Sequence, residues 1–511
     1  MKLQPALIFG EHMVLQRSVP LPVWGRSVRN DTVTVTLGAN SAQGTTVNGG
    51  WKVILPPMEA CLRTSMTITS EKTGERIEFR DVAVGEVWLA GGQSNMEFLL
   101  KYDEEAEALF AEDEDPDLRY FRYPTANFTG CIEKDPYPED GFWRRWTDRE
   151  NKGMFSGPAA YMGRKLREAL GVPVAFVGVH WGGTPAAAWT DMESLQANPA
   201  LKPVLDWYRD ELQKIDPLKY YAASDRPVPE QDERMRAMMD RFMMGIGLRE
   251  FLEKGPPPMP PMDYTPYMPG PRSAVRPSGL YETMLCKTAP YAARGIIWYQ
   301  GEDDDFRGWA GFYDESMKTL IRSWRTLWHA PLPFLQVELA PFCGMGPTAA
   351  KQYFLMRENM RKAADALPDV HDVCIMDAGD EINIHVRKKR PVGERLALLA
   401  RKYVYGEADL LADSPRAREL VRENGRLRIR FSDAGDGLSL RGSLDPLLHV
   451  FADGKEIGCT CAVDGDCLLV TADCAAASSV RVEYMQVNYC EAPLFSSAGL
   501  PAFPFVLEVA P

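Results

Sequence analysis

Residues 82–97 read Val-Ala-Val-Gly-Glu-Val-Trp-Leu-Ala-Gly-Gly-Gln-Ser-Asn-Met-Glu, and this stretch decides the fold class. Residues 82–90 are mostly apolar, which is typical of a buried strand. Gly91 and Gly92 end that strand, and a serine follows on the turn at position 94. A tight glycine turn between a buried strand and a helix indicates an α/β architecture.

Buried strands and helical patterns alternate along the chain beyond this stretch. The expected strands are residues 172–179, 295–299, 334–339 and 370–376, and the expected helices are residues 157–170, 312–327 and 348–366. Such alternation predicts a parallel sheet covered by helices. In sheets of this kind, functional residues gather at the carboxyl ends of the strands.

The two ends of the chain have β character instead. Residues 32–37 and 66–69 alternate polar and apolar side chains, and turn residues punctuate them as in hairpins. Further strands are expected at residues 427–431, 447–452, 468–471 and 480–484. We therefore predict three domains, which are an N-terminal β domain at 1–85, an α/β core at 86–404 and a C-terminal β domain at 405–511 that could pack with the N-terminal one.

An insertion at about residues 205–275 interrupts the α/β pattern. It combines methionines at helical spacing within 235–244 with the Pro-rich run 255–261. We expect helices followed by an irregular loop, with the methionines packed in a core. A flap over the functional site is the alternative interpretation.

Composition excludes several classes of protein. The chain has 511 residues and a net charge of −13, which opposes binding to nucleic acid because phosphate neutralisation needs clustered Lys and Arg. No stretch is long and apolar enough for a membrane span, and the short apolar run near the N-terminus is interrupted by Pro5. We therefore expect a cytoplasmic protein, although a chain whose signal peptide has been removed would look similar. The ten cysteines lack paired C-x2-C spacing, so we predict reduced thiols and no metal site.

Four polar segments follow predicted strands and form the candidate site. They are Gly91–Glu97, His180–Trp189, Ile297–Glu302 and Asp377–His385. Ser94 can expose its hydroxyl at the sheet edge, and the N–H groups after it can face a developing oxyanion. A structural turn in which Ser94 caps the helix explains the same segment equally well.

A base for Ser94 must come from six histidines. Four of them lie in the flanking β regions, in a loop or at the start of a strand: His12, His329, His371 and His449. His180 and His385 both follow strand ends, where a neutral imidazole can take a serine proton. Placement favours His385, because His180 adjoins Trp181 and serves equally well as a packed structural histidine.

Taken in order, these segments resemble the sialate O-acetylesterases within the SGNH hydrolases. The matching segments are Phe9–Gln16, Val23–Gly25, Gly85–Glu97, Gly183–Trp189, Leu280–Tyr281, Trp298–Glu302, Ile384–His385, Lys389 and Val392–Ala397. The resemblance covers residue 9 to about 400. It implies a three-layer α/β/α parallel-sheet core flanked by antiparallel β domains, and a serine esterase that removes O-acetyl groups from carbohydrates such as O-acetylated sialic acids.

The resemblance also implies roles for individual residues. Ser94 would be the nucleophile and His385 its base. The Ser94 N–H, the Gly183 N–H and the Gln300 side chain would form the oxyanion hole, and Gln93 and Glu302 would line the pocket. The partner would be an acetylated carbohydrate, with no metal or organic cofactor, no nucleic acid and no membrane. The oligomeric state stays open.

Two departures from the family pattern leave alternatives. An acid is expected three residues before the histidine, but Ile382 stands there, so Asp380, Asp377 or a backbone carbonyl would orient His385. We favour Asp380. The run Asp303-Asp304-Asp305 adds negative charge that would disfavour an anionic sugar, which makes an acetylated xylan fragment the alternative substrate. A glycan-binding protein without esterase activity is the alternative from another class.

Overall fold

The computed structural model describes residues 2–131, 140–224, 240–241, 243, 268–344, 349–423 and 426–509. The chain forms two compact units, each described here by itself. The first unit comprises Met1–Ile246, Pro256–Gln300 and Glu315–Phe334, and the second comprises Gly247–Gly255, Gly301–Asp314 and Leu335–Pro511.

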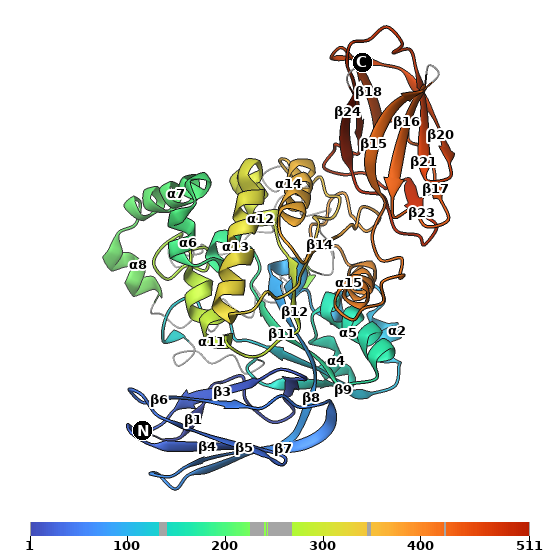
Figure 1. Ribbon diagram of the computed structural model, residues 1–511. Coiled ribbons are helices and arrows are strands. Elements are labelled where there is room, and N and C mark those ends of the chain that lie inside the picture. The colour runs from blue at the N-terminus through green and yellow to red at the C-terminus, as the bar shows by residue number, and fades with distance from the viewer. Residues whose placement is uncertain are drawn as a thin grey trace. The chain divides into compact units, whose positions relative to one another are not determined.

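The first unit begins with short strands (blue in Figure 1). They are β1 (Gln4–Pro5), β2 (Val14–Gln16), β3 (Leu21–Arg26), β4 (Thr32–Leu37), β5 (Asn40–Thr45), β6 (Gly50–Leu55) and β7 (Cys61–Ser70). Strand β4 has the predicted bounds, and its side chains alternate between half-buried and buried. Strands β1, β3 and β6 form one antiparallel sheet, and β4 pairs with β5 and β7.

A single long strand, β8 (Arg76–Gly92), leads from this β region into the α/β core (Figure 1). Its side chains alternate in exposure up to Asp81 and are all buried from Val82 onward. Residues 76–84 pair antiparallel with β7, whereas residues 86–92 pair in parallel with β11 (Val174–His180). The change in burial follows the apolar run in the sequence. The predicted domain boundary at residues 85/86 falls inside this strand, and the three-domain division stays a prediction.

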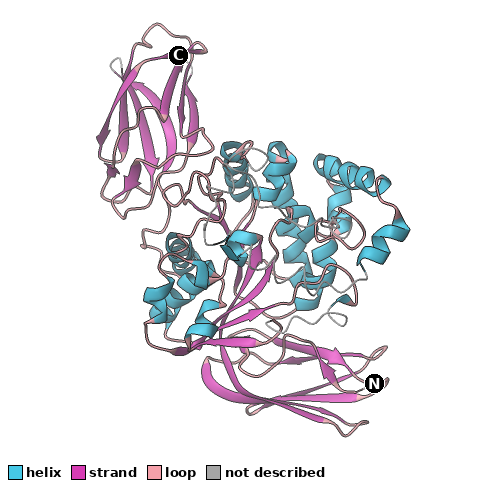
Figure 2. Ribbon diagram, turned by 180° about the vertical axis from the view of Figure 1, so that it is seen from behind, coloured by secondary structure: helices cyan, strands magenta, loops and turns pink. Residues whose placement is uncertain are grey.

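The sheet of the first unit has the order β10-β9-β11-β8-β12, with β9, β11, β8 and β12 parallel. The further strands are β9 (Asp115–Arg122), β10 (Trp143–Trp146) and β12 (Gly295–Tyr299). The helices are α1 (Ser94–Glu97), α2 (Ala106–Phe110), α4 (Arg149–Gly153), α5 (Gly157–Leu170), α6 (Met192–Ala197), α7 (Lys202–Gln213), α8 (Pro217–Ser224), α11 (Cys286–Thr288) and most of α13 (Tyr313–Trp328). Figure 2 shows these helices around the strands of the core. The predicted parallel sheet is confirmed.

Helices α7 and α8 confirm the helical start of the predicted insertion. Most of its remainder, including the Pro-rich run 255–261, lies outside the described residues, so the flap interpretation stays a prediction. None of the helices in the described ranges is both long and apolar enough to cross a membrane.

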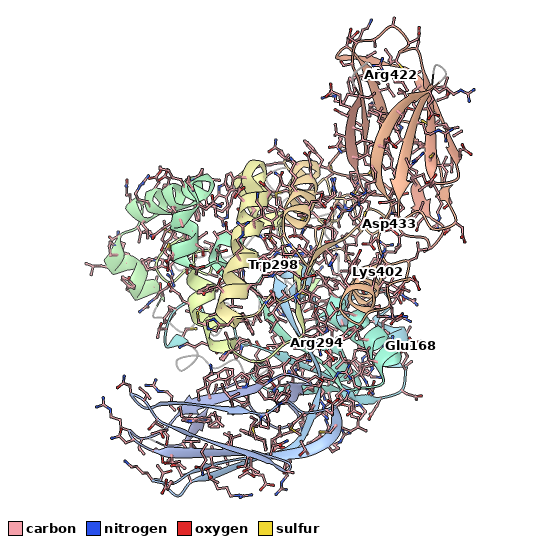
Figure 3. All side chains as sticks on the ribbon, viewed as in Figure 1. Glu168, Arg294, Trp298, Lys402, Arg422 and Asp433 are labelled. Atoms are coloured by element: carbon pink, nitrogen blue, oxygen red, sulfur yellow. The ribbon has the colours of Figure 1, made fainter. Side chains whose placement is uncertain are left out.

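The carboxyl end of β8 is packed too tightly for any side chain at its two glycines. A Cβ atom on Gly91 would lie 2.8 Å from the ring of Trp324 and 2.9 Å from that of Trp298, which Figure 3 labels. Trp298 and Trp324 pack edge to face with ring centroids 5.5 Å apart. Gly92 has φ of +136°, and a Cβ there would lie 2.2 Å from the carbonyl oxygen of Tyr299. The strand can therefore turn at this point only because both residues are glycine.

Gly92→Ala is expected to lower the free energy of unfolding by more than about 4 kcal/mol, because both the φ angle and the clash with β12 must be relieved. Urea unfolding of the purified variant measures the effect. Gly171→Ala is the matched control, because Gly171 also has positive φ but a Cβ there meets nothing within 4 Å. A variant of Gly92 as stable as this control would contradict the tight turn.

The second unit contains the rest of the α/β region. Its strands are β13 (Phe334–Val337), all but its first residue, and β14 (Val370–Val373), and its helices are α12 (Glu302–Arg307), α14 (Tyr353–Ala366) and α15 (Arg390–Tyr403). The helix predicted for 348–366 starts late because the Asp305 carboxylate accepts the N–H groups of Lys351 and Gln352, each at 2.7 Å. The strand predicted to end at Met376 ends at Val373, and the carbonyl of Cys374 accepts a side-chain hydrogen bond from Arg395.

The C-terminal part of the second unit is an antiparallel β region (red in Figure 1). One sheet has the order β15-β16-β21-β20, a second has β19-β18-β22-β24, and β17 pairs with β23. The bounds are β15 (Arg416–Glu423), β16 (Arg426–Ser432), β17 (Leu438–Leu440), β18 (Leu448–Ala452), β19 (Lys455–Ile457), β20 (Cys459–Asp464), β21 (Cys467–Ala472), β22 (Val480–Tyr484), β23 (Leu494–Ser496) and β24 (Phe505–Val509). Ile429 and Val470 of the first sheet share a buried core with Val450 and Val482 of the second. The predicted C-terminal β character is confirmed.

This β region is joined to the α/β part of its own unit through Asn488. The backbone carbonyl of Asn488 accepts from the N–H of Phe342 at 3.0 Å, and its side-chain oxygen accepts from the N–H of Tyr353 at 3.0 Å. Arg357 is completely buried and donates to the carbonyl of Val487. These bonds hold the start of α14 to a loop that lies at least 130 residues away in sequence.

Candidate active site

Ser94 is the first residue of the short helix α1, directly after the turn that ends β8. Gln93 occupies the N-cap position and makes no side-chain capping bond, so the interpretation of Ser94 as the cap is wrong. The N–H of Gln93 donates to the carbonyl of Tyr299 at 3.0 Å, which ties the turn to the end of β12. Ser94 itself is half-buried, whereas Asn95 and Met96 are buried. A reachable hydroxyl on a rigid turn is what a nucleophile requires.

The loop after β11 lies against Ser94. A Cβ atom on Gly182 would be only 3.1 Å from the Cβ of Ser94, so the backbone of Gly182 approaches the serine closely. Gly183 has φ of +67°, is exposed, and a Cβ there would meet nothing within 4 Å. Among the described residues, the space beside Gly183 is therefore open, and its backbone is exposed to solvent.

Gln300, at the end of β12, connects to the same loop. Its side chain is completely buried, and Nε2 donates to the carbonyl of Thr184 at 3.1 Å. The Thr184 hydroxyl donates to the carbonyl of Trp181 at 2.7 Å. The ends of three neighbouring strands thus bring together Gln93, Ser94, Gly183 and Gln300, as the positions of the predicted strands require. The chemical roles of these residues stay a prediction.

The contacts of His180 are those of a side chain packed in the interior. It is buried at the end of β11, and its Nε2 is hydrogen-bonded to the Tyr120 hydroxyl at 2.7 Å. Burial, with a smaller contribution from Arg122, lowers the pKa of His180 well below 6.5. These contacts support the structural interpretation of His180 that the sequence left open.

His385 lies in the second unit, in the loop between β14 and α15, and is buried. Its backbone N–H donates to the side-chain oxygen of Asn383 at 3.0 Å. Burial, together with the positive charge of Lys389, lowers the pKa of His385 to about 3. The imidazole is therefore neutral at neutral pH, which is the form that accepts a proton from a serine.

The two candidate acids near His385 have other described partners. Oδ1 of Asp380 accepts the N–H groups of Ile382 at 2.9 Å and Asn383 at 2.8 Å, which closes the turn before the histidine. Asp377 forms a bidentate ion pair with Arg395, with both N–O distances 2.6 Å. The described bonds give Asp380 a part in shaping the His385 loop, and its role as the orienting acid stays a prediction.

The acidic run of the second unit is partly compensated within the unit. Glu302 is buried at the first position of α12. Arg307 pairs with Asp303, with its Nε 2.5 Å from Oδ2, and Asp305 is the carboxylate that accepts two backbone N–H groups before α14. The Arg307–Asp303 ion pair compensates one of the three negative charges on which the expectation against an anionic sugar rested.

The structure also places near Ser94 two residues to which the sequence analysis gave no role. Glu97, the last residue of α1, accepts the N–H of Gly182 at 2.7 Å. Arg122, the last residue of β9, donates to the same carboxylate at 2.5 Å. The sequence did contain one indication of Glu97. An acidic residue ends the Gly91–Glu97 segment, and a residue three positions after Ser94 lies close to it on a helix.

Metal-ligating side chains do not gather in the described parts of the chain. No group of three or more His, Cys, Asp or Glu residues there could hold a metal ion. The cysteines are free thiols.

Comparisons with known proteins find similar esterases. Residues 268–402 match the family model of carbohydrate esterases described as sialic acid-specific acetylesterases. The sialate O-acetylesterase of Rattus norvegicus is 25% identical, covering 82% of this chain and 77% of the relative, and that of Homo sapiens is 24% identical over 82% and 75%. The crystal structure of a carbohydrate acetylesterase from Xanthomonas citri is 29% identical with a TM-score of 0.75, covering 99% of both chains. The chain is therefore a carboxylic ester hydrolase that is similar to sialate O-acetylesterases and to a carbohydrate acetylesterase of known structure.

Proposed function

We propose that this esterase removes O-acetyl groups from carbohydrates and that O-acetylated sialic acids are its preferred substrates. One observation carries the proposal: Ser94 stands on the turn after β8 with the Gly182–Gly183 backbone beside it and open space at Gly183. This arrangement offers a nucleophile and a backbone donor to one carbonyl group, which is the requirement of acyl transfer. The sialate O-acetylesterases among the relatives support the choice of sugar.

The proposed reaction has two steps. Ser94 Oγ attacks the acetyl carbonyl while His385 takes the serine proton, and the tetrahedral intermediate collapses when the sugar oxygen leaves with that proton. The acetyl group is then an ester on Ser94. A water molecule gives a proton to His385 and attacks this ester, and acetate leaves as Ser94 regains its proton.

The proposed oxyanion hole uses the backbone N–H groups of Ser94 and Gly183 and the side chain of Gln300. The burial of Gln300 and its bond to Thr184 support this role, because a preorganised donor loses little freedom when charge develops. Gln93 and Glu302 are proposed to line the pocket. We further propose that the core has the three-layer α/β/α arrangement of SGNH hydrolases, and that Asp380 orients His385, with a serine–histidine dyad as the alternative.

Gln300→Ala is expected to lower kcat by about 10²–10³ while changing KM little, because the donor acts mainly on the transition state. Steady-state hydrolysis of 4-nitrophenyl acetate measures both constants. Circular dichroism and the unfolding midpoint control for the loss of the bond to Thr184. A variant with normal kcat would remove Gln300 from the oxyanion hole.

The substrate is tested by acetate release from a matched panel. We expect the highest kcat/KM on O-acetylated sialic acids, with lower values on acetylated xylo-oligosaccharides and only residual release from Ser94→Ala. Acetylated neutral sugars are the second candidate, because the Xanthomonas citri structure that aligns over 99% of this chain is that of a carbohydrate acetylesterase. A preference for xylo-oligosaccharides over sialic acids would replace the first substrate class by the second.

A further inference from the structure

We propose that Glu97 and Arg122 are a positioning pair that aims the Gly183 N–H at the oxyanion. The inference rests on the proposed esterase function and assigns it two further residues. Glu97 ends α1, Arg122 ends β9, and Gly182 lies two residues beyond β11, so three separate elements meet at one carboxylate.

The contacts of Glu97 are specific. Oε2 accepts the N–H of Gly182 at 2.7 Å, and Oε1 accepts from Nη2 of Arg122 at 2.5 Å. Arg122 is itself placed by a second carboxylate, because its Nε lies 3.6 Å from Oδ2 of Asp140. The side chains of Arg122 and Glu97 are only 17% and 24% exposed, so water screens this pair less than it screens a surface ion pair.

The pair holds one end of a peptide group whose other end is also held. The peptide between Trp181 and Gly182 donates its N–H to Glu97 and accepts the Thr184 hydroxyl at its carbonyl, at 2.7 Å in each case. Gly182 has no side chain to restrict its own dihedral angles. With the preceding peptide held at both ends, less freedom remains for the next peptide, which carries the Gly183 N–H.

The charge of the pair matters as well as its geometry. A Cβ on Gly182 would lie 3.3 Å from Oε2 of Glu97 and 3.1 Å from Cβ of Ser94, so the carboxylate stands close to the reacting serine. A bare negative charge there would oppose the developing oxyanion. Arg122 cancels that charge while leaving Oε2 free to accept the Gly182 N–H.

The test separates positioning from mere stability by comparing two substitutions at one site. Glu97→Gln keeps an oxygen acceptor for Gly182, whereas Glu97→Ala removes it. We expect Glu97→Ala to lower kcat on 4-nitrophenyl acetate by about 10–100-fold with KM nearly unchanged, and Glu97→Gln to regain most of that loss. The rate of Ser94 labelling by a fluorophosphonate probe should fall in parallel, because labelling uses the same donors.

Arg122 tests the role of charge. Arg122→Met leaves the Glu97 carboxylate uncompensated, and kcat should fall further than in Glu97→Gln. The double variant Glu97→Gln with Arg122→Met removes both charges and should be more active than Arg122→Met alone. Glu107→Gln is the matched control, because it breaks the exposed Arg149–Glu107 pair of the same unit and should leave kcat unchanged.

Two outcomes would overturn the inference. One is a Glu97→Ala variant that unfolds earlier but keeps normal kcat well below its unfolding temperature, since that result would make the pair structural only. The other is an equal loss of kcat in Glu97→Gln and Glu97→Ala. Failure of the proposed function itself is recognised separately, because the wild-type protein would then hydrolyse no acetate ester, or Ser94→Ala would keep the wild-type activity.

Discussion

Ser94→Ala is expected to lower kcat/KM on 4-nitrophenyl acetate by at least about 10⁴-fold, because no acetyl-enzyme can form without the hydroxyl. The residual activity should come from direct attack of water on the ester, with the oxyanion-hole donors still in place. The effect on stability should be small, since Ser94 is half-buried and Gln93 occupies the helix N-cap position.

The measurement is initial-rate hydrolysis with the purified variant, combined with fluorophosphonate labelling and an unfolding curve. Ser156→Ala is a useful comparison, because the Ser156 hydroxyl donates to the carbonyl of Met96 at 2.7 Å within the same region and is buried. It should lose stability and keep its labelling. Activity or labelling in Ser94→Ala equal to that of the wild-type protein would contradict the assignment of the nucleophile.

His385→Ala is expected to lower kcat/KM by about 10³–10⁵-fold, because the serine proton then has no base to accept it. His449→Gln is the matched control, since His449 lies in the same unit and pairs with Glu456 on the surface. Loss of activity in the control, or its retention in His385→Ala, would move the base to another residue.

The wild-type pH profile gives an independent check on His385. An imidazole acts as a base only when neutral, so activity is lost as pH falls through its pKa in the folded protein. Burial lowers that pKa to about 3, and the acid limb of kcat/KM should therefore lie well below the 6.5 of an ordinary histidine. A half-maximal rate near pH 6.5 would show an imidazole more exposed to water than this structure gives it.

Much of the secondary structure could be predicted from local patterns. The bounds of β4, β12, β22 and α5 agree with the predicted ranges, because burial alternates or repeats with the period that the sequence displays. Predictions were wrong where a distant side chain determines the backbone. Helix α14 begins five residues late because the Asp305 carboxylate holds the two residues before Tyr353.

In the candidate site, too, some features follow from local patterns and others depend on distant residues. Placing Ser94, Gly183 and Gln300 at adjacent strand ends needed only the order of buried strands and the rule that parallel strands end at one edge. Assigning a structural role to His180 needed its bond to Tyr120, 60 residues away. Asp380 likewise has amide partners that no spacing rule indicated.

The sequence by itself determined the α/β core, its flanking β regions, the candidate nucleophile segment and the family resemblance, because apolar periodicity and short motifs are properties of neighbouring residues. Only the tertiary structure decided two hydrogen bonds between distant residues. Glu97 accepts the N–H of Gly182, 85 residues away in sequence, and Gln300 donates to the carbonyl of Thr184, 116 residues away. These bonds depend on where loops come together after folding. A hydrogen bond requires donor and acceptor within about 3 Å, and local patterns in the sequence do not encode that distance.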